Sequence, residues 1–307
     1  MRRRGCLLAL AGGAGAALLP WCFAGASEGV YQELWDLDQD GSGVPALRVG
    51  ARGDPERGWV LVDETGGGPD HQIFPEVVIP PAKRRTYELC AALFDNYRLD
   101  QRRYEDTTEA EAREMLALLE AVAATPVMAR ARAVVEANAG HRFEGDGWLA
   151  FLFDVWFRPF DLGDNVDLSG FEHVVVGEQK QAAVGGQHFW YTYHLADGAG
   201  PFGDTVSFLG LRYDGRVRDL GRERPDEVTL SYRWDAWDAA GGAFRPLTQQ
   251  IGGFFVGCSI EGLVALGTVR FAGGPRTSVV NGARYDLRLY RSDDGRSMRT
   301  FFPALLG

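Results

Sequence analysis

The apolar residues of this chain change their spacing near Pro159. Before this residue they recur at intervals of three and four, as on one face of an α-helix, for example over residues 107–122. After it they alternate with polar residues, as in half-buried strands, and Asp-Gly turns separate the runs. Helices gathered in the first part of a chain and strands in the second are typical of an α+β fold. We therefore predict a helical amino-terminal region over residues 27–163 and a β-rich, mostly antiparallel region over residues 164–307.

The first 26 residues have the pattern of an export signal. Three arginines at positions 2–4 precede an apolar stretch rich in small residues, and Ala24-Gly25-Ala26 matches an A-x-A cleavage site. This predicts a signal peptide over residues 1–26 and a secreted or periplasmic mature protein, with the general and twin-arginine export routes both open. A retained anchor is disfavoured because the apolar run is short and glycine-rich. No later segment is apolar enough to span a bilayer, so no membrane association is expected after cleavage.

Charge restricts how the mature protein can bind nucleic acid. The chain has 32 Lys and Arg against 42 Asp and Glu. Without residues 1–26, which hold three Arg and no acidic residue, 29 basic residues face 42 acidic ones, a net charge of −13. Such a protein does not bind polyanions through a general basic surface, so any nucleic-acid site must be a local cluster. The only lysines are Lys83 and Lys180. Cys90 and Cys258 lie in apolar runs and are predicted to be buried free thiols.

The residue pattern also places individual elements. Thr86 and Thr107 precede apolar stripes at helical spacing and are the expected N-caps of two helices. Residues 38–43, DQDGSG, resemble an acidic calcium loop but lack its closing Glu, so we expect a solvated turn there. Helices are predicted at residues 30–37, 86–97, 107–122, 125–137, 147–157 and 259–267, and strands at 59–62, 171–176, 188–194, 206–213, 228–234, 253–256 and 285–290.

Two of the five histidines occur in unusual surroundings. His173 falls within one predicted strand and His188 begins the next, 15 residues later, so the two can face each other across a hairpin. A pair of imidazoles suits proton transfer in both directions near neutral pH. From spacing alone, the favoured alternative is two buried histidines whose hydrogen bonds are satisfied by Glu172 and Glu178. A zinc site is a further alternative, but no Cys or His lies at a suitable spacing for a third ligand.

The residues around this pair resemble a known family. Residues 169–178, SGFEHVVVGE, resemble the signature of the EndoU family of uridylate-specific endoribonucleases. The resemblance implies an EndoU-like α+β fold and cleavage of single-stranded, uridine-containing RNA. It also implies attack of the 2′-hydroxyl on the adjacent phosphorus, as in the ribonuclease A reaction, giving a 2′,3′-cyclic phosphate and a 5′-hydroxyl. Further matches in the same order occur at residues 33–39, 93–97, 154–157, 252–257 and 298–303.

The resemblance also implies roles for individual residues. His188 corresponds to the general base and His173 to the general acid, although the sequence does not settle which acts on which oxygen. Glu172 and Glu178 match acidic positions that orient the histidines or bind manganese. Thr300 matches a residue near the base or the phosphate.

Two positions depart from the family pattern. Gln249 stands where the family has its third catalytic residue, a lysine, and neither Lys83 nor Lys180 is placed by the sequence to replace it. Arg245 is the candidate substitute cation, because a fixed positive charge also stabilises a phosphorane-like transition state. Phe302 stands where the family usually has Tyr, and can still stack on a base.

The departures leave three hypotheses. The first is an exported EndoU-type endoribonuclease with reduced activity. The second is a catalytically weak or inactive EndoU-like RNA-binding protein. The third, and least favoured, is a secreted interaction module in which the histidine pair is merely buried.

Overall fold

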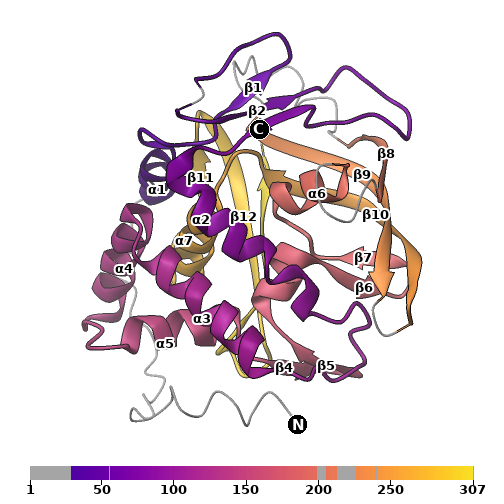
Figure 1. Ribbon diagram of the computed structural model, residues 1–307. Helices are drawn as coiled ribbons and strands as arrows, with labels where there is room; N and C mark the ends of the chain where they lie inside the picture. The colour runs from indigo at the N-terminus through magenta and orange to yellow at the C-terminus, as the bar shows by residue number, and fades with distance from the viewer. Residues whose placement is uncertain (1–28, 55, 199–204, 213–225, 239–240, 307) are drawn as a thin grey trace.

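The protein was analysed as a computed structural model that describes residues 29–54, 56–198, 205–212, 226–238 and 241–306. The predicted signal peptide lies outside these residues. Helices gather on one side of the molecule and the main antiparallel sheet lies on the other, with a second sheet behind the helices (Figure 1). The expected α+β class is confirmed, whereas the division at residues 163 and 164 stays a prediction.

The amino-terminal part holds five helices and a small sheet among the described residues. Helix α4 packs against α1 and, together with it, against α7, whose residues are almost all buried. The bounds are α1 Val30–Gln39, α2 Pro81–Ala91, α3 Glu109–Ala123, α4 Pro126–Ala139, α5 Gly147–Trp156 and, later in the chain, α7 Ile260–Phe271; the small sheet is β1 Ala46–Arg48, β2 Trp59–Val62 and β3 Glu76–Val78.

Two helix starts differ from the expectation. Helix α2 begins at Pro81, where proline in the first turn needs no backbone donor, and Thr86 lies inside it with its hydroxyl donating to the carbonyl of Lys83. Helix α3 is capped by Thr108, not Thr107, because Thr108 and Glu111 form a reciprocal capping box. A short 3₁₀ turn, η2 Phe94–Asn96, replaces the end of the predicted helix over residues 86–97.

The carboxy-terminal part contains the two larger sheets. The five-stranded sheet has the order β6-β7-β10-β9-β8, antiparallel except where β7 meets β10, and the three-stranded sheet has the order β11-β12-β13. The bounds are β4 Phe160–Leu162, β5 Asn165–Leu168, β6 Glu178–Lys180, β7 Ala183–Gly185, β8 Val206–Leu211, β9 Glu227–Asp238, β10 Ala243–Phe255, β11 Thr277–Val280, β12 Ala283–Arg291 and β13 Met298–Leu305.

The predicted strands at residues 171–176 and 188–194 are wrong. The first is a single π-helical turn, η3 Glu172–Val176, and the second is mostly a short helix, α6 Trp190–Ala196. Three consecutive valines favour a strand by local propensity. All three are buried in η3, so tertiary packing decides the conformation against that propensity.

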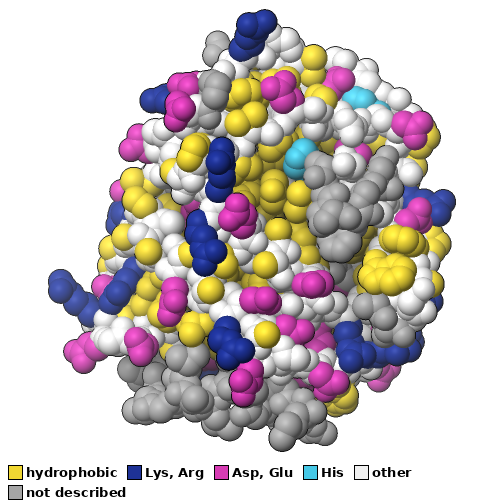
Figure 2. Space-filling view, in the orientation of Figure 1, with side chains coloured by type: hydrophobic (Ala, Val, Ile, Leu, Met, Phe, Trp, Pro, Cys, Tyr) yellow, Lys and Arg dark blue, Asp and Glu magenta, His cyan; other side chains and the backbone are white. Residues whose placement is uncertain are grey.

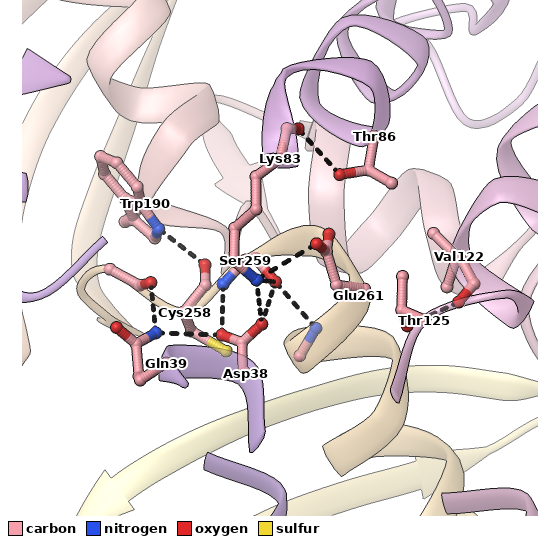
Figure 3. A network of polar contacts seen from close by, with 12 residues as sticks. Asp38, Gln39, Lys83, Thr86, Val122, Thr125, Trp190, Cys258, Ser259 and Glu261 are labelled. Atoms are coloured by element: carbon pink, nitrogen blue, oxygen red, sulfur yellow. Dashed lines mark hydrogen bonds and ion pairs between the residues drawn. The ribbon is translucent and has the colours of Figure 1, made fainter. Parts of the chain in front are cut away.

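A buried polar network joins α1 and α2 to the start of α7 (Figure 3). The Lys83 ammonium donates to Asp38 at 2.7 Å, to the Ser259 hydroxyl at 3.1 Å and to Glu261 at 3.2 Å. Burial acts to lower the pKa of Lys83, but the two carboxylates outweigh it and leave that pKa raised. The expected solvated turn is therefore wrong at Asp38, which is 2% exposed and accepts from the backbone N–H of Ser259.

Two other expectations about the chain are met in the part that the structure describes. Cys90 and Cys258 are buried and unpaired, as predicted. On the face shown in Figure 2, acidic and basic side chains are intermingled and form no continuous basic surface. None of the helices described is long and apolar enough to cross a membrane.

Candidate active site

The π-helical turn η3 presents His173 at the edge of the core. Its three valines, Val174 to Val176, are buried and anchor the turn. Gly177 ends it with a φ of +89°, a conformation open to glycine, and the chain then enters β6. The His173 side chain keeps 18% exposure, so the turn holds a partly accessible imidazole on a rigid support.

Glu178, the first residue of β6, fixes the orientation of His173. One carboxylate oxygen of Glu178 is hydrogen-bonded to the Nδ1 atom of His173, and the Glu178 side chain is 3% exposed. A carboxylate accepts only, so the Nδ1 atom carries the proton in this pair. The other ring nitrogen, Nε2, is then the atom left for a substrate. The neighbouring Glu172 is buried within η3.

The β6–β7 hairpin returns the chain to η3 and places His188 beside His173. The backbone N–H groups of Gln187 and His188 donate to the carbonyls of His173 and Val174 at 2.8 and 2.6 Å. Gly186 makes this approach possible, since a Cβ atom there would lie 1.7 Å from the His173 carbonyl oxygen. The two imidazole centroids are 6.0 Å apart.

His188 lies in a much drier environment than His173. Burial lowers its pKa to about 3; the nearby His173 acts in the same direction, and a backbone hydrogen bond to Gly253 opposes them. A bond that raises the pKa is one in which the ring donates to the Gly253 carbonyl. Because Nδ1 has no hydrogen-bond partner among the described residues, that donor is Nε2. The neutral ring therefore carries an unpartnered lone pair on Nδ1.

Thr300 and Phe302 approach the pair from β13. They are two residues apart on one strand and so share a face. The Phe302 ring stacks on His188 at 4.6 Å, with the Arg288 guanidinium 5.8 Å from the Phe302 centroid. Thr300 is buried, and its hydroxyl has no hydrogen-bond partner within the described part of the chain. The predicted base-stacking ring thus contacts a histidine in this structure.

Gln249 lies close to the pair but supports the backbone rather than adding charge. Its amide donates to the carbonyl of Gly186 at 3.0 Å and also bonds Tyr232, whose hydroxyl reaches Gln187. The side chain at the family lysine position therefore holds the loop that carries His188.

Arg245 is not brought to the histidine pair. Its guanidinium forms an ion pair with Asp238 at 2.7 Å, towards the far end of the β9–β10 hairpin. Four residues of extended strand separate it from Gln249, a span of about 13 Å. Residues 238–247, which look like an insertion in the sequence, form this outer end of the hairpin.

A small pocket adjoins His173 on its Glu178 side. It has a volume of about 40 Å³, and Lys180 and Arg299 line it together with His173 and Glu178. The described residues that line it include neither His188 nor Phe302. Lys180 was not a candidate from sequence, yet its position two residues after Glu178 on β6 puts it on the same strand face. Recognising β6 as a strand would have revealed it.

Comparison with known proteins identifies the family. The profile described as "Endoribonuclease XendoU" matches residues 27–303. The chain belongs to this family. The predicted EndoU membership and the class of enzyme, an EndoU-type endoribonuclease, are thereby confirmed.

Individual relatives cover almost the whole chain. Poly(U)-specific endoribonuclease-A of Xenopus laevis is 27% identical over 292 residues, which are 90% of this chain and 92% of the relative. Uridylate-specific endoribonuclease C of Danio rerio is also 27% identical, covering 90% of this chain and 87% of the relative. The solved structure titled "The structure of XendoU: a splicing independent snoRNA processing endoribonuclease" has a TM-score of 0.68 at 22% identity, covering 91% of this chain and 97% of that one. At that identity the last comparison supports the fold.

Proposed function

We propose that this chain is an exported endoribonuclease that cleaves single-stranded RNA at uridylates. In the proposed reaction the 2′-hydroxyl attacks the adjacent phosphorus and expels the 5′-oxygen of the next nucleotide, giving a 2′,3′-cyclic phosphate and a 5′-hydroxyl. The observation that carries this proposal is the pair of imidazoles, 6.0 Å apart, in two different environments. Two proton-transfer groups held apart in this way can serve the two oxygens that exchange protons in such a reaction.

His188 is the proposed general base. Its low pKa keeps the ring neutral at physiological pH, and its Nδ1 lone pair has no competing partner among the described residues. Stacking on Phe302 and the bond to Gly253 hold the ring in place. An anionic phosphate near this ring would favour the protonated form and raise the pKa towards a range where proton transfer is effective.

His173 is the proposed general acid. The Glu178 carboxylate favours the charged imidazolium and fixes the ring so that Nε2–H points away from Glu178. That proton can pass to the leaving 5′-oxygen. Glu178 thus acts as a positioning residue for His173, in agreement with one of the two roles implied for the acidic positions.

The described residues do not fit a manganese site. No group of three His, Cys, Asp or Glu side chains among them is placed to hold a metal ion. Glu178 is engaged by His173, and Lys180 and Arg299 line the same pocket, so a divalent cation there would meet two positive charges. No step of the proposed reaction is routed through a metal ion.

Recognition of the uracil base is assigned to Thr300 and Phe302. The buried Thr300 hydroxyl, without a partner in the described structure, can exchange a hydrogen bond with a polar edge of the base. Relatives named poly(U)-specific and uridylate-specific endoribonucleases support uridylates as the substrate class. Export rests on the signal-peptide pattern of residues 1–26.

One observation favours a second candidate, a weakly active or inactive RNA-binding protein. Gln249 carries no charge and its amide is occupied by the Gly186 carbonyl, while Arg245 is paired with Asp238. Neither side chain stabilises the charge that develops on the phosphoryl oxygens, and loss of one such group typically lowers the rate by about 10²–10³-fold.

A set of oligonucleotides with a single cleavable position tests the proposal. Each carries one ribonucleotide, U, C, A or G, in an otherwise 2′-deoxy strand, and the mature protein is assayed in EDTA and in Mn²⁺. We expect cleavage at the ribouridine in both conditions. Binding of the ribouridine strand without cleavage in either condition would favour the second candidate, and equal cleavage at all four bases would contradict uridylate specificity.

A further inference from the structure

The pocket beside His173 carries two positive charges that the fold itself does not use. Lys180 and Arg299 line it, and the structure gives neither of them an acidic partner among the described residues. Other arginines of this chain are ion-paired, as Arg130 is with Glu33 and Arg276 with Asp286. In a mature protein with a net charge of −13, two cations left together beside a catalytic residue favour an anionic ligand.

The size and lining of the pocket restrict that ligand. A volume of about 40 Å³ holds roughly three water molecules, which is the scale of one phosphate group and too small for a base. Gln101 and Asn165 add amide donors to the lining. Glu178 is the acidic side chain in the described lining, and its carboxylate is hydrogen-bonded to His173, which offsets its charge when His173 is protonated.

The position of the pocket decides which phosphate it takes. The scissile phosphate must lie between His173 and His188 to exchange protons with both, whereas the pocket is lined by His173 but not, among the described residues, by His188 or Phe302. If His173 protonates the leaving 5′-oxygen, a pocket on its other side faces the leaving nucleotide. The next phosphate in the 3′ direction then comes within reach of Lys180 and Arg299.

We propose that Lys180 and Arg299 form a subsite for the phosphate on the 3′ side of the leaving nucleotide. This proposal rests on the proposed function for the direction of the strand. The subsite increases the affinity for RNA longer than the scissile dinucleotide. It does not replace the missing charge at the scissile phosphate, because it lies on the far side of His173.

Two dinucleotides that differ by one phosphate test this directly. Uridylyl-(3′,5′)-uridine, UpU, has only the scissile phosphate, and UpUp adds a 3′-phosphate on the leaving nucleotide. For the wild-type protein we expect kcat/KM for UpUp to exceed that for UpU by about tenfold or more, the worth of a charge-assisted hydrogen bond. Lys180→Met and Arg299→Met should each reduce this ratio, and the double variant should bring it close to one, with kcat/KM for UpU nearly unchanged.

Arg130→Gln provides the matched control, because it removes one positive charge from the far helical side of the molecule. Its ratio should equal that of the wild type. Variants that slow UpU and UpUp equally would place the two cations at the scissile phosphate and overturn the proposal. A wild-type ratio close to one would also overturn it.

A binding measurement separates failure of the subsite from failure of the proposed function. The 2′-deoxy analogues dUpdU and dUpdUp cannot be cleaved, so their dissociation constants are independent of catalysis. Tighter binding of dUpdUp to the wild type, lost in the double variant, supports the subsite even if neither RNA dinucleotide is cut. Equal binding of the two analogues to the wild-type protein contradicts it whatever the activity.

Discussion

Replacing Gly186 by alanine should remove activity without touching any ionisable group. A Cβ atom at this position would lie 1.7 Å from the His173 carbonyl oxygen, so these atoms must separate by about 1.3 Å to reach the shortest contacts that real Cβ atoms make. That movement breaks the 2.8 Å hydrogen bond from Gln187 to the same carbonyl, and the φ of +73° adds backbone strain. A buried bond left unmade costs about 1–3 kcal/mol and the left-handed conformation about 1–2 kcal/mol, so we expect a loss of about 2–5 kcal/mol in unfolding free energy.

The effect on catalysis should be larger than the effect on stability alone. His188 follows Gly186 by two residues, and a misplacement of about 1 Å typically lowers a rate by about 10²-fold. We would measure urea denaturation and single-turnover cleavage of an oligonucleotide with one ribouridine. Gly140→Ala is the matched control, since Gly140 has a φ of +69° with no atom within 4 Å of an added Cβ. If Gly186→Ala behaves like Gly140→Ala in both assays, the argument that this loop positions His188 is wrong.

Three further predictions concern charge. Lys83→Met should lower the unfolding free energy by about 3–5 kcal/mol at pH 7, because it leaves Asp38 and Glu261 buried without their cation; a loss below 1 kcal/mol would contradict this. The pKa of His188 is lowered from 6.5 to about 3 in the folded protein, so between these values the unfolded chain binds a proton that the folded chain does not; stability should fall with pH across this window, by up to about 1.4 kcal/mol per pH unit, and denaturation of His188→Gln should show a shallower dependence. Gln249→Lys can keep the bond to the Gly186 carbonyl and add charge beside the pair, so single-turnover cleavage should become faster, and an unchanged or slower rate would contradict a charge deficit.

Much of the fold could be predicted because its elements follow local rules. Helix α4 begins at the proline after Thr125, α7 begins after Ser259, and β9 and β10 alternate buried and exposed residues over part of their length. The two segments that carry the histidines could not be predicted. In η3 every valine is buried, so no alternation marks which residues face the core. Their conformation is fixed by the bonds from Gln187 and His188, which lie far along the chain.

The site was predictable in composition but not in its electrostatics. Family resemblance pointed to His173, His188 and Glu178, and the structure brings these together. It could not show that Gln249 bonds a backbone carbonyl or that Arg245 is paired elsewhere, because both depend on cross-strand register. Lys180 escaped notice for the same reason, since its proximity to His173 follows from a three-residue strand.

The division of roles between the two histidines is the central claim, and a substrate with a sulfur atom in place of the bridging 5′-oxygen tests it most directly. A thiolate leaves without protonation, so this substrate needs a general base but no general acid. We would compare single-turnover cleavage of the oxygen and sulfur substrates by the wild type, His173→Ala and His188→Ala, after thermal melts show that both variants are folded. On the oxygen substrate each variant should be about 10²–10⁴-fold slower than the wild type. On the sulfur substrate His173→Ala should recover to near the wild-type rate while His188→Ala stays slow. Recovery of His188→Ala instead, or of neither variant, would contradict the account.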